Sequence, residues 1–169
     1  MQMVSEGQFR TAPDQVVQRA IDKKLKVEGG VEATDQIWAV VDAEPQASHA
    51  NIGKLEDAKL LADGAGINVT ISNPCFEHWL RLHCRDCDGA HESAQACKAA
   101  FRSEVQGATK SKKKRKKVEI EPLITMKSIQ LARERARQQH ATKGKQPPHQ
   151  CDPNVTDMYK MIDALEGLS

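Results

Sequence analysis

The sequence predicts an α/β domain with a mostly parallel sheet flanked by helices. Residues 36–42, QIWAVVD, hold a short apolar run without polar alternation, which is typical of a strand covered on both faces. Residues 67–71, INVTI, form a second short strand. Between them we expect a helix capped by Asn51, with a buried face formed by Ile52, Leu55, Ala58 and Ala62. Strand, helix and strand of this length make a βαβ unit, whose crossover is right-handed.

Further helices are expected on both sides of this unit. Thr11-Ala12-Pro13-Asp14 predicts a helix start, and Gly29-Gly30 predicts the end of that helix. After the second strand, Asn73 is expected to be an N-cap and Pro74 the first residue of a helix. Its predicted face holds Phe76, Trp79, Leu80 and His83. Another helix is expected over residues 91–105, and residues 1–4 are expected to form a short strand.

The C-terminal part predicts two more helices. The first follows Glu121-Pro122, runs to about His140 and places Leu123, Met126, Ile129 and Ala132 on one side. Asp152-Pro153 opens the second, whose apolar stripe should pack on the body through Val155, Met158, Ile162 and Leu165. The expected organisation is an α/β core over residues 1–106, a basic linker over 107–121 and C-terminal helices over 122–169.

Positive charge is concentrated in one segment of the chain. The 169 residues carry a net charge of +2, but residues 107–145 hold 13 Lys or Arg against three Glu, a balance of +10. The centre of this segment is the run of Lys112, Lys113, Lys114, Arg115, Lys116 and Lys117. Such an uneven distribution predicts a polyanion partner, DNA or RNA, whose phosphates the run would contact. The alternative is a solvated loop.

Several function classes find no support in the sequence. No apolar run approaches the roughly 20 residues that cross a bilayer, and the N-terminus lacks the features of a signal peptide, so a cytoplasmic protein with no membrane partner is expected. The five cysteines are therefore expected to be reduced thiols. Cys75 lies at a predicted helix N-terminus, which would lower its pKa, although packing in the core is the favoured interpretation. A Walker A motif is absent, so nucleotide hydrolysis by this chain alone is not expected.

Two acidic residues end the first predicted strand. Asp42 and Glu44 lie two residues apart in an extended segment and therefore point to the same side. Ligands of parallel sheets bind at the carboxyl ends of the strands, and paired carboxylates suit a hard cation such as Mg²⁺. The alternative is that Asp42 begins an ordinary turn before Pro45.

The cysteines and one histidine offer a second possible metal site. Cys84, Cys87, His91 and Cys97 would make a Cys₃His set that zinc accepts. A single CxxC is weak evidence, and the alternative is two loop thiols with one core cysteine.

The motifs together resemble the RloB family. The residues that carry the resemblance are 12–20, 36–44, 66–67, 72–83 (SNPCFEHWLRLH) and 152–159 (DPNVTDMY), with SNPCFEHWLRLH as the specific part. The resemblance implies a Toprim-like fold, a link with restriction or phage defence, and a metal site for phosphodiester cleavage. On this chain the site would use Asp42 and Glu44 for Mg²⁺ or Mn²⁺, in place of the family's Asp-x-Asp, with Glu77 and His83 nearby.

The N-terminus departs from the family pattern. Relatives begin with a strand and helix that carry a Glu-Gly motif, and this chain is expected to start after that unit. Glu6-Gly7 matches the motif itself, but its spacing to Asp42 is too short. The leading hypothesis is a Mg²⁺-dependent nuclease-like component of phage defence. Two rivals stay open: a non-catalytic or truncated subunit that binds an ATPase encoded nearby, and a zinc-stabilised nucleic-acid-binding module.

Overall fold

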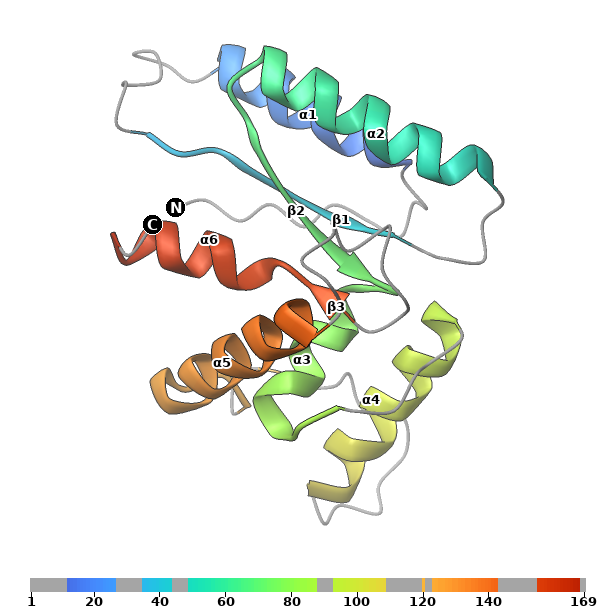
Figure 1. Cartoon of the computed structure of the whole chain (residues 1–169), viewed down its shortest axis with the longest axis vertical. Coiled ribbons are helices and arrows are strands. Elements are labelled where there is room, and N and C mark those ends of the chain that lie inside the picture. Colours follow the sequence, from blue (N-terminus) through green and yellow to red (C-terminus); the bar gives the residue numbers. More distant parts are fainter. Residues whose placement is uncertain are drawn as a thin grey trace.

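The computed structural model describes residues 12–26, 35–43, 49–87, 93–108, 120, 123–142 and 155–167. Its elements follow one another along the chain, as Figure 1 shows. They are α1 (Pro13–Lys26), β1 (Trp38–Asp42), α2 (His49–Gly64), β2 (Asn68–Asn73), α3 (Phe76–Cys84), α4 (Ala94–Ala108), α5 (Met126–Thr142), β3 (Val155–Thr156) and α6 (Met158–Leu165). The strand expected over residues 1–4 and the basic run 112–117 lie outside the described residues.

The predicted βαβ unit is confirmed by β1, α2 and β2. The two strands pair in parallel, from Trp38 opposite Asn68 to Asp42 opposite Ser72. The predicted inner face of α2 is also correct, because Leu55, Ala58 and Ala62 are buried. The helix begins at His49, so Asn51 lies inside it and the predicted N-cap is wrong. Ala50, a strong helix former, extends the helix before Asn51.

The third strand was missed by the sequence analysis. Val155 and Thr156 form β3 and pair antiparallel with Asn73 and Ser72 of β2. The last helix therefore begins at Met158, and the expectation that Val155 belongs to its apolar stripe is wrong. A β-branched pair suits a strand, and both side chains are fully buried there. Among the described residues the sheet is mixed, with the order β1-β2-β3.

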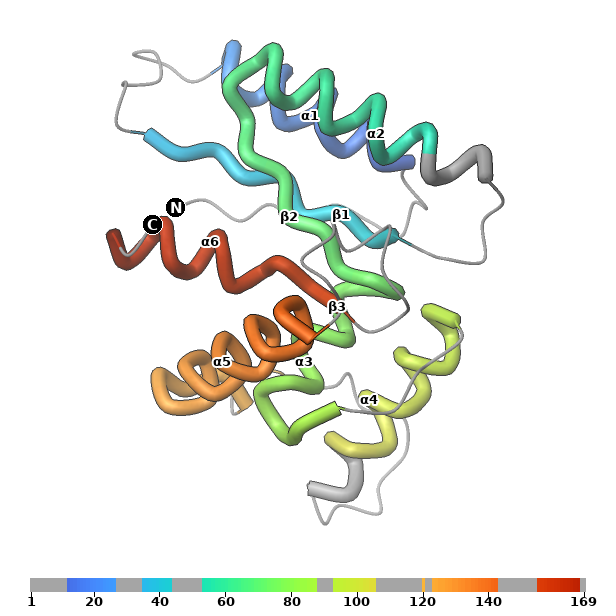
Figure 2. Tube along the Cα trace, viewed as in Figure 1, coloured from blue at the N-terminus to red at the C-terminus, as the bar shows by residue number. Residues whose placement is uncertain are grey.

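Two layers of helices enclose the sheet. Figures 1 and 2 show α1 and α2 on one side, with α3, α5 and α6 on the other. The first layer packs on the sheet through Val17, Ala39, Ala58, Ala62 and Ile67. A second core joins α3, α4, α5 and α6, including Trp79, Leu82, Phe101, Ala136 and Met158. Helices α5 and α6, which come late in the sequence, thus share a core with α3.

Three details of the helical expectations are wrong. Asn73 stays in β2 because it pairs with Val155, so Pro74 does not start the next helix, which begins at Phe76. The helix expected directly after Glu121-Pro122 begins only at Met126, whose side chain is 66% exposed. Ala132 and Ala136 form the buried face of α5, since small side chains let this helix approach α3 closely. Leu165, expected in the last stripe, is 53% exposed.

Candidate functional site

Asp42 joins the end of β1 to the start of α3. Its Oδ1 accepts a hydrogen bond from the main-chain N–H of Phe76, the first residue of the helix, at 2.8 Å. The N-cap residue itself, Cys75, makes no side-chain capping hydrogen bond. Asp42 therefore supplies from another element the carboxylate that usually comes from the N-cap, and its negative charge faces the positive end of the helix.

Glu77 lies in the first turn of α3, next to the residue that Asp42 binds. Its side chain is half-buried, and its charge is one of the lesser influences that raise the pKa of Cys75. The structure thus brings Asp42 to the helical turn that carries Glu77. Glu44 lies outside the described residues, so its pairing with Asp42 stays a prediction.

Two fully buried thiols lie beside this turn. A hydrogen bond to Cys97 is the main cause that raises the pKa of Cys75, and burial adds to it. The same hydrogen bond lowers the pKa of Cys97. The expected lowering of the Cys75 pKa by the helix N-terminus is therefore wrong. A protonated, buried Cys75 suits packing between α3 and α4, which agrees with the favoured interpretation of this residue.

His83 lies at the opposite end of α3 from Phe76. The seven positions that separate them in the chain correspond to about 10 Å along a helix. Its Nδ1 is 3.2 Å from Ser128 Oγ, and its ring packs edge-on against Trp79 with 5.0 Å between ring centroids. The side chain is buried, which lowers its pKa, and the charge of Arg135 lowers it further. The structure thus gives His83 partners on α5 and in the core.

The cysteines of the proposed zinc set lie in different environments. Cys84 is exposed, whereas Cys87 and Cys97 are buried, and burial raises the pKa of Cys87 to about 11. His91 lies outside the described residues. Within the described part of the chain, no group of three or more His, Cys, Asp or Glu side chains is placed to hold a metal ion. Each metal hypothesis includes one residue outside the described residues: His91 in the zinc set and Glu44 in the Mg²⁺ site.

A buried polar network under β2 was missed by the sequence analysis. Asp157 is 6% exposed, and its Oδ1 accepts hydrogen bonds from Thr70 Oγ1 at 2.9 Å and from the Ile71 N–H at 2.6 Å. Ser72 and Thr156 add a hydroxyl contact of 2.7 Å between the same two strands. The only sequence signal was the position of Asp157 within the DPNVTDMY motif. This network fixes the C-terminal segment on the strand that leads to α3.

A buried ion pair fixes α3 against α4 and was also missed. Arg81 Nη2 lies 2.7 Å from Glu104 Oε1, with side-chain exposures of 6% and 19%. The Arg81 Nε–H donates to the same carboxylate, which makes the pair bidentate. The interaction holds the pKa of Arg81 above its usual range. Together with the Asp42 contact at its N-terminus, it links α3 to β1 and to α4.

Comparison with known proteins gives one family. The model of a family described as RloB-like protein matches residues 2–165, nearly the whole chain. No curated protein and no solved structure matches the chain. In the described residues no helix is long and apolar enough to cross a membrane.

Proposed function

The chain belongs to the RloB-like protein family, and from this premise we propose that it is a metal-dependent nuclease-like component of a defence or restriction-linked system. In this proposal the carboxyl edge of β1 is the active edge of a Toprim-like site. Asp42 and Glu44 hold Mg²⁺ or Mn²⁺, and Glu77 assists from α3. The basic run 112–117 holds the nucleic-acid backbone. His83 acts as a positioning residue that secures the far end of α3.

The contact between Asp42 and the Phe76 N–H is the observation that carries the proposal. Carboxylate ligands in metal sites are themselves hydrogen-bonded, and this second contact fixes their orientation. A main-chain N–H is a rigid donor, so it holds the Asp42 carboxylate at the edge where parallel sheets bind ligands. Carboxylate oxygens are the ligands that Mg²⁺ prefers, and the side chains of Asp42 and Glu77 supply oxygens of this kind.

The bound metal would stabilise the attacking and leaving oxygens of a phosphodiester during cleavage. The chain's own residues have separate tasks. Asp42 is held in place by α3, Glu77 adds negative charge at the first turn of that helix, and the basic segment increases the local concentration of the polyanion. This division of tasks predicts that loss of Asp42 abolishes cleavage while binding of nucleic acid remains.

A cleavage assay tests the proposal. Labelled single-stranded and duplex DNA and RNA are incubated with the full chain in Mg²⁺, in Mn²⁺ or in EDTA. We expect cleavage only with metal, and its loss in Asp42→Asn and reduction in Glu77→Gln. Asp63→Asn, an exposed carboxylate at the end of α2, is the matched control and should cleave as the wild type does. Cleavage that survives Asp42→Asn would refute the proposed site.

A second candidate function is a non-catalytic subunit that docks on an ATPase. Leu60 and Leu61 are 71% and 39% exposed on α2, and we propose this helix as the surface on which such a partner would dock. If this function is correct, activity appears only with the partner and is unchanged by Asp42→Asn. Leu60→Ser/Leu61→Ser should then abolish the partner-dependent activity.

A further inference from the structure

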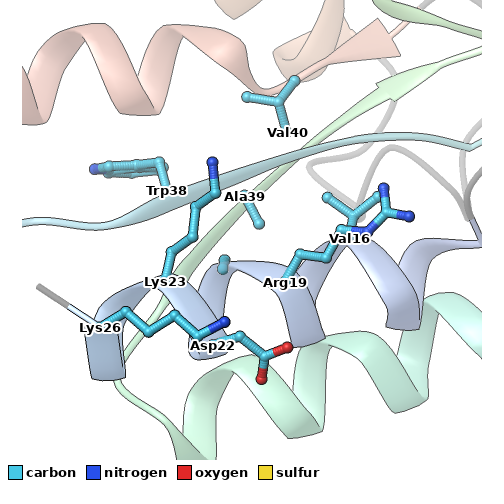
Figure 3. Close-up of a pocket in the computed structure, with 9 residues that line it drawn as sticks. Val16, Arg19, Asp22, Lys23, Lys26, Trp38, Ala39 and Val40 are labelled. Carbon is cyan, nitrogen blue, oxygen red and sulfur yellow. The ribbon is translucent and has the colours of Figure 1, made fainter. Parts of the chain in front are cut away.

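A groove runs between α1 and the edge of β1, away from the proposed metal site. Its volume is about 420 Å³, and Arg19, Asp22, Lys23, Lys26, Trp38 and Val40 are among the residues that line it. Figure 3 shows the three basic side chains along α1, with β1 passing above them. Because they are spaced by three and four residues, they form one stripe on the helix, about 10 Å long.

The charges of this stripe are unpaired within the described residues. Arg19, Lys23 and Lys26 make neither hydrogen bonds nor ion pairs there, whereas the neighbouring Lys24 donates to the Ala65 carbonyl at 2.7 Å. Asp22, the one acid among the described residues that line the groove, accepts a hydrogen bond from Gln18 at 3.0 Å. A groove with three unpaired cations and one acid attracts an anion.

Trp38 lines the groove from across β1, because Trp38 and Val40 point to the face of the strand opposite Ala39, which packs against α1. Its indole N–H donates to Gln36 Oε1 at 3.2 Å, which satisfies the hydrogen-bond donor of the side chain. The side chain is half-buried, and it contributes to the lining of the groove beside the basic residues. Aromatic side chains beside cations in a groove are the usual elements of single-strand binding.

The main chain of β1 adds polar groups to the same groove. The Ile37 carbonyl accepts from Asn68 N, and the Ala43 N–H donates to the Ser72 carbonyl, so odd-numbered residues turn their main-chain groups toward β2. Trp38 and Val40 therefore turn theirs toward the opposite edge. No strand pairs with this edge among the described residues. These N–H and carbonyl groups can bind base edges.

We propose that this groove binds single-stranded nucleic acid, with the phosphates along Arg19, Lys23 and Lys26 and a base stacked on Trp38. The groove runs along β1. Val16, which lines it near the start of α1, packs against the core cluster that contains Val41. The start of α1 therefore lies near the Asp42 end of β1, and the basic stripe leads from Trp38 toward that end. Trp38 and Asp42 are about 13 Å apart along the strand. Delivery of the strand to Asp42 rests on the proposed function, whereas binding in the groove does not.

Binding is measured by fluorescence anisotropy with a labelled oligothymidylate and the full chain, in EDTA so that cleavage cannot occur. We expect Trp38→Leu to weaken binding about tenfold, since it removes the stacking surface, and Trp38→Phe to retain most of the affinity. The oligothymidylate should also quench tryptophan emission of the wild type. Trp38→Phe should abolish this quenching, because the other tryptophan, Trp79, is only 4% exposed.

The charge stripe is tested by salt dependence. Arg19→Gln/Lys23→Gln/Lys26→Gln should reduce the slope of log affinity against log salt by about 2, since each lost phosphate contact on a single strand removes about 0.7. The matched control, Lys54→Gln/Lys59→Gln/Arg102→Gln, removes two Lys and one Arg from exposed positions outside the groove and outside the basic segment, and it should leave the slope nearly unchanged.

Equal effects of the two triple variants, or binding without quenching of Trp38, would overturn the proposal. Tighter binding of polyglutamate than of oligothymidylate would also overturn it, because it would identify an acidic peptide as the occupant. The proposed function is tested separately, since loss of metal binding leaves groove binding intact and groove variants leave metal binding intact.

Discussion

The carboxylate of Asp42 and the main-chain N–H of Phe76 lie 2.8 Å apart, 34 positions apart in the chain. This hydrogen bond connects the parallel strand pair to the helix that carries Glu77 and His83. One residue thus has a structural task at α3 and, in our proposal, a catalytic task at the metal. The two tasks can be separated by the choice of substitution.

Asp42→Ala and Asp42→Asn should differ in stability. Alanine removes the acceptor for the Phe76 N–H, and loss of a capping side chain costs about 1 kcal/mol. Asparagine keeps an oxygen acceptor, so the free energy of unfolding of this variant should lie within about 0.5 kcal/mol of the wild-type value. Urea denaturation followed by circular dichroism measures both variants. Equal stability of the two variants would show that the capping contact contributes nothing.

Asp157→Ala should be the more damaging carboxylate substitution. It leaves the Ile71 N–H and the Thr70 hydroxyl buried without their acceptor, which costs about 2–3 kcal/mol. Asp57→Ala on the exposed side of α2 is the control and should change the free energy of unfolding by less than about 0.5 kcal/mol. Denaturant midpoints of both variants test this prediction. A small effect at Asp157 would mean that water replaces the carboxylate.

His83 should make the protein less stable in mild acid. Burial and Arg135 lower the pKa of His83 in the folded state. The unfolded chain therefore takes up a proton at about pH 6.5, while the folded protein resists it until lower pH. Stability is fully present above pH 6.5 and decreases as the pH falls through the lowered pKa. Asparagine can replace Nδ1 toward Ser128, so His83→Asn should flatten this dependence in pH-resolved denaturation. Parallel profiles for the two proteins would contradict the assignment.

The thiols should differ strongly in reactivity. Cys84 is the exposed cysteine of the described residues, whereas Cys75, Cys87 and Cys97 are buried. In a Cys151→Ser background, a thiol reagent such as DTNB should modify Cys84 first and the buried cysteines only on unfolding. Mass spectrometry of native and denatured samples identifies the modified residues. Fast native modification of Cys75 would instead reveal opening between α3 and α4.

Local patterns predicted the strand pair and most helices because their causes are local. The apolar run at 37–41 and the helical spacing of Leu55, Ala58 and Ala62 show directly which faces are buried. Pairing across long sequence distances has no such signal. Val155 forms a strand because Asn73 is available beside it, and Asp157 is buried because Ile71 and Thr70 need an acceptor. These contacts exist only once the fold has brought the two ends of the chain together.

The candidate site could likewise be predicted only where its features have a local sequence signal. The acid at the end of β1 could be identified from the strand that precedes it, but its hydrogen bond to Phe76 could not, because the sequence favoured Asn73 as the cap. The basic stripe on α1 follows a helical period, yet its proposed role depends on the neighbouring edge of β1, which pairs with no strand among the described residues. The family match over residues 2–165 confirms the suspected family and leaves the chemistry of Asp42 as a proposal.

Calorimetric titration of Mg²⁺ and Mn²⁺ into the wild type, Asp42→Asn and Asp63→Asn tests the central claim most directly. Asp42→Asn preserves an acceptor for Phe76, so the fold is retained and only the ligand charge is lost. We predict a saturable binding isotherm for the wild type and Asp63→Asn, and its loss in Asp42→Asn. An isotherm that is the same in all three proteins, or absent from the wild type, would contradict a metal site at the end of β1.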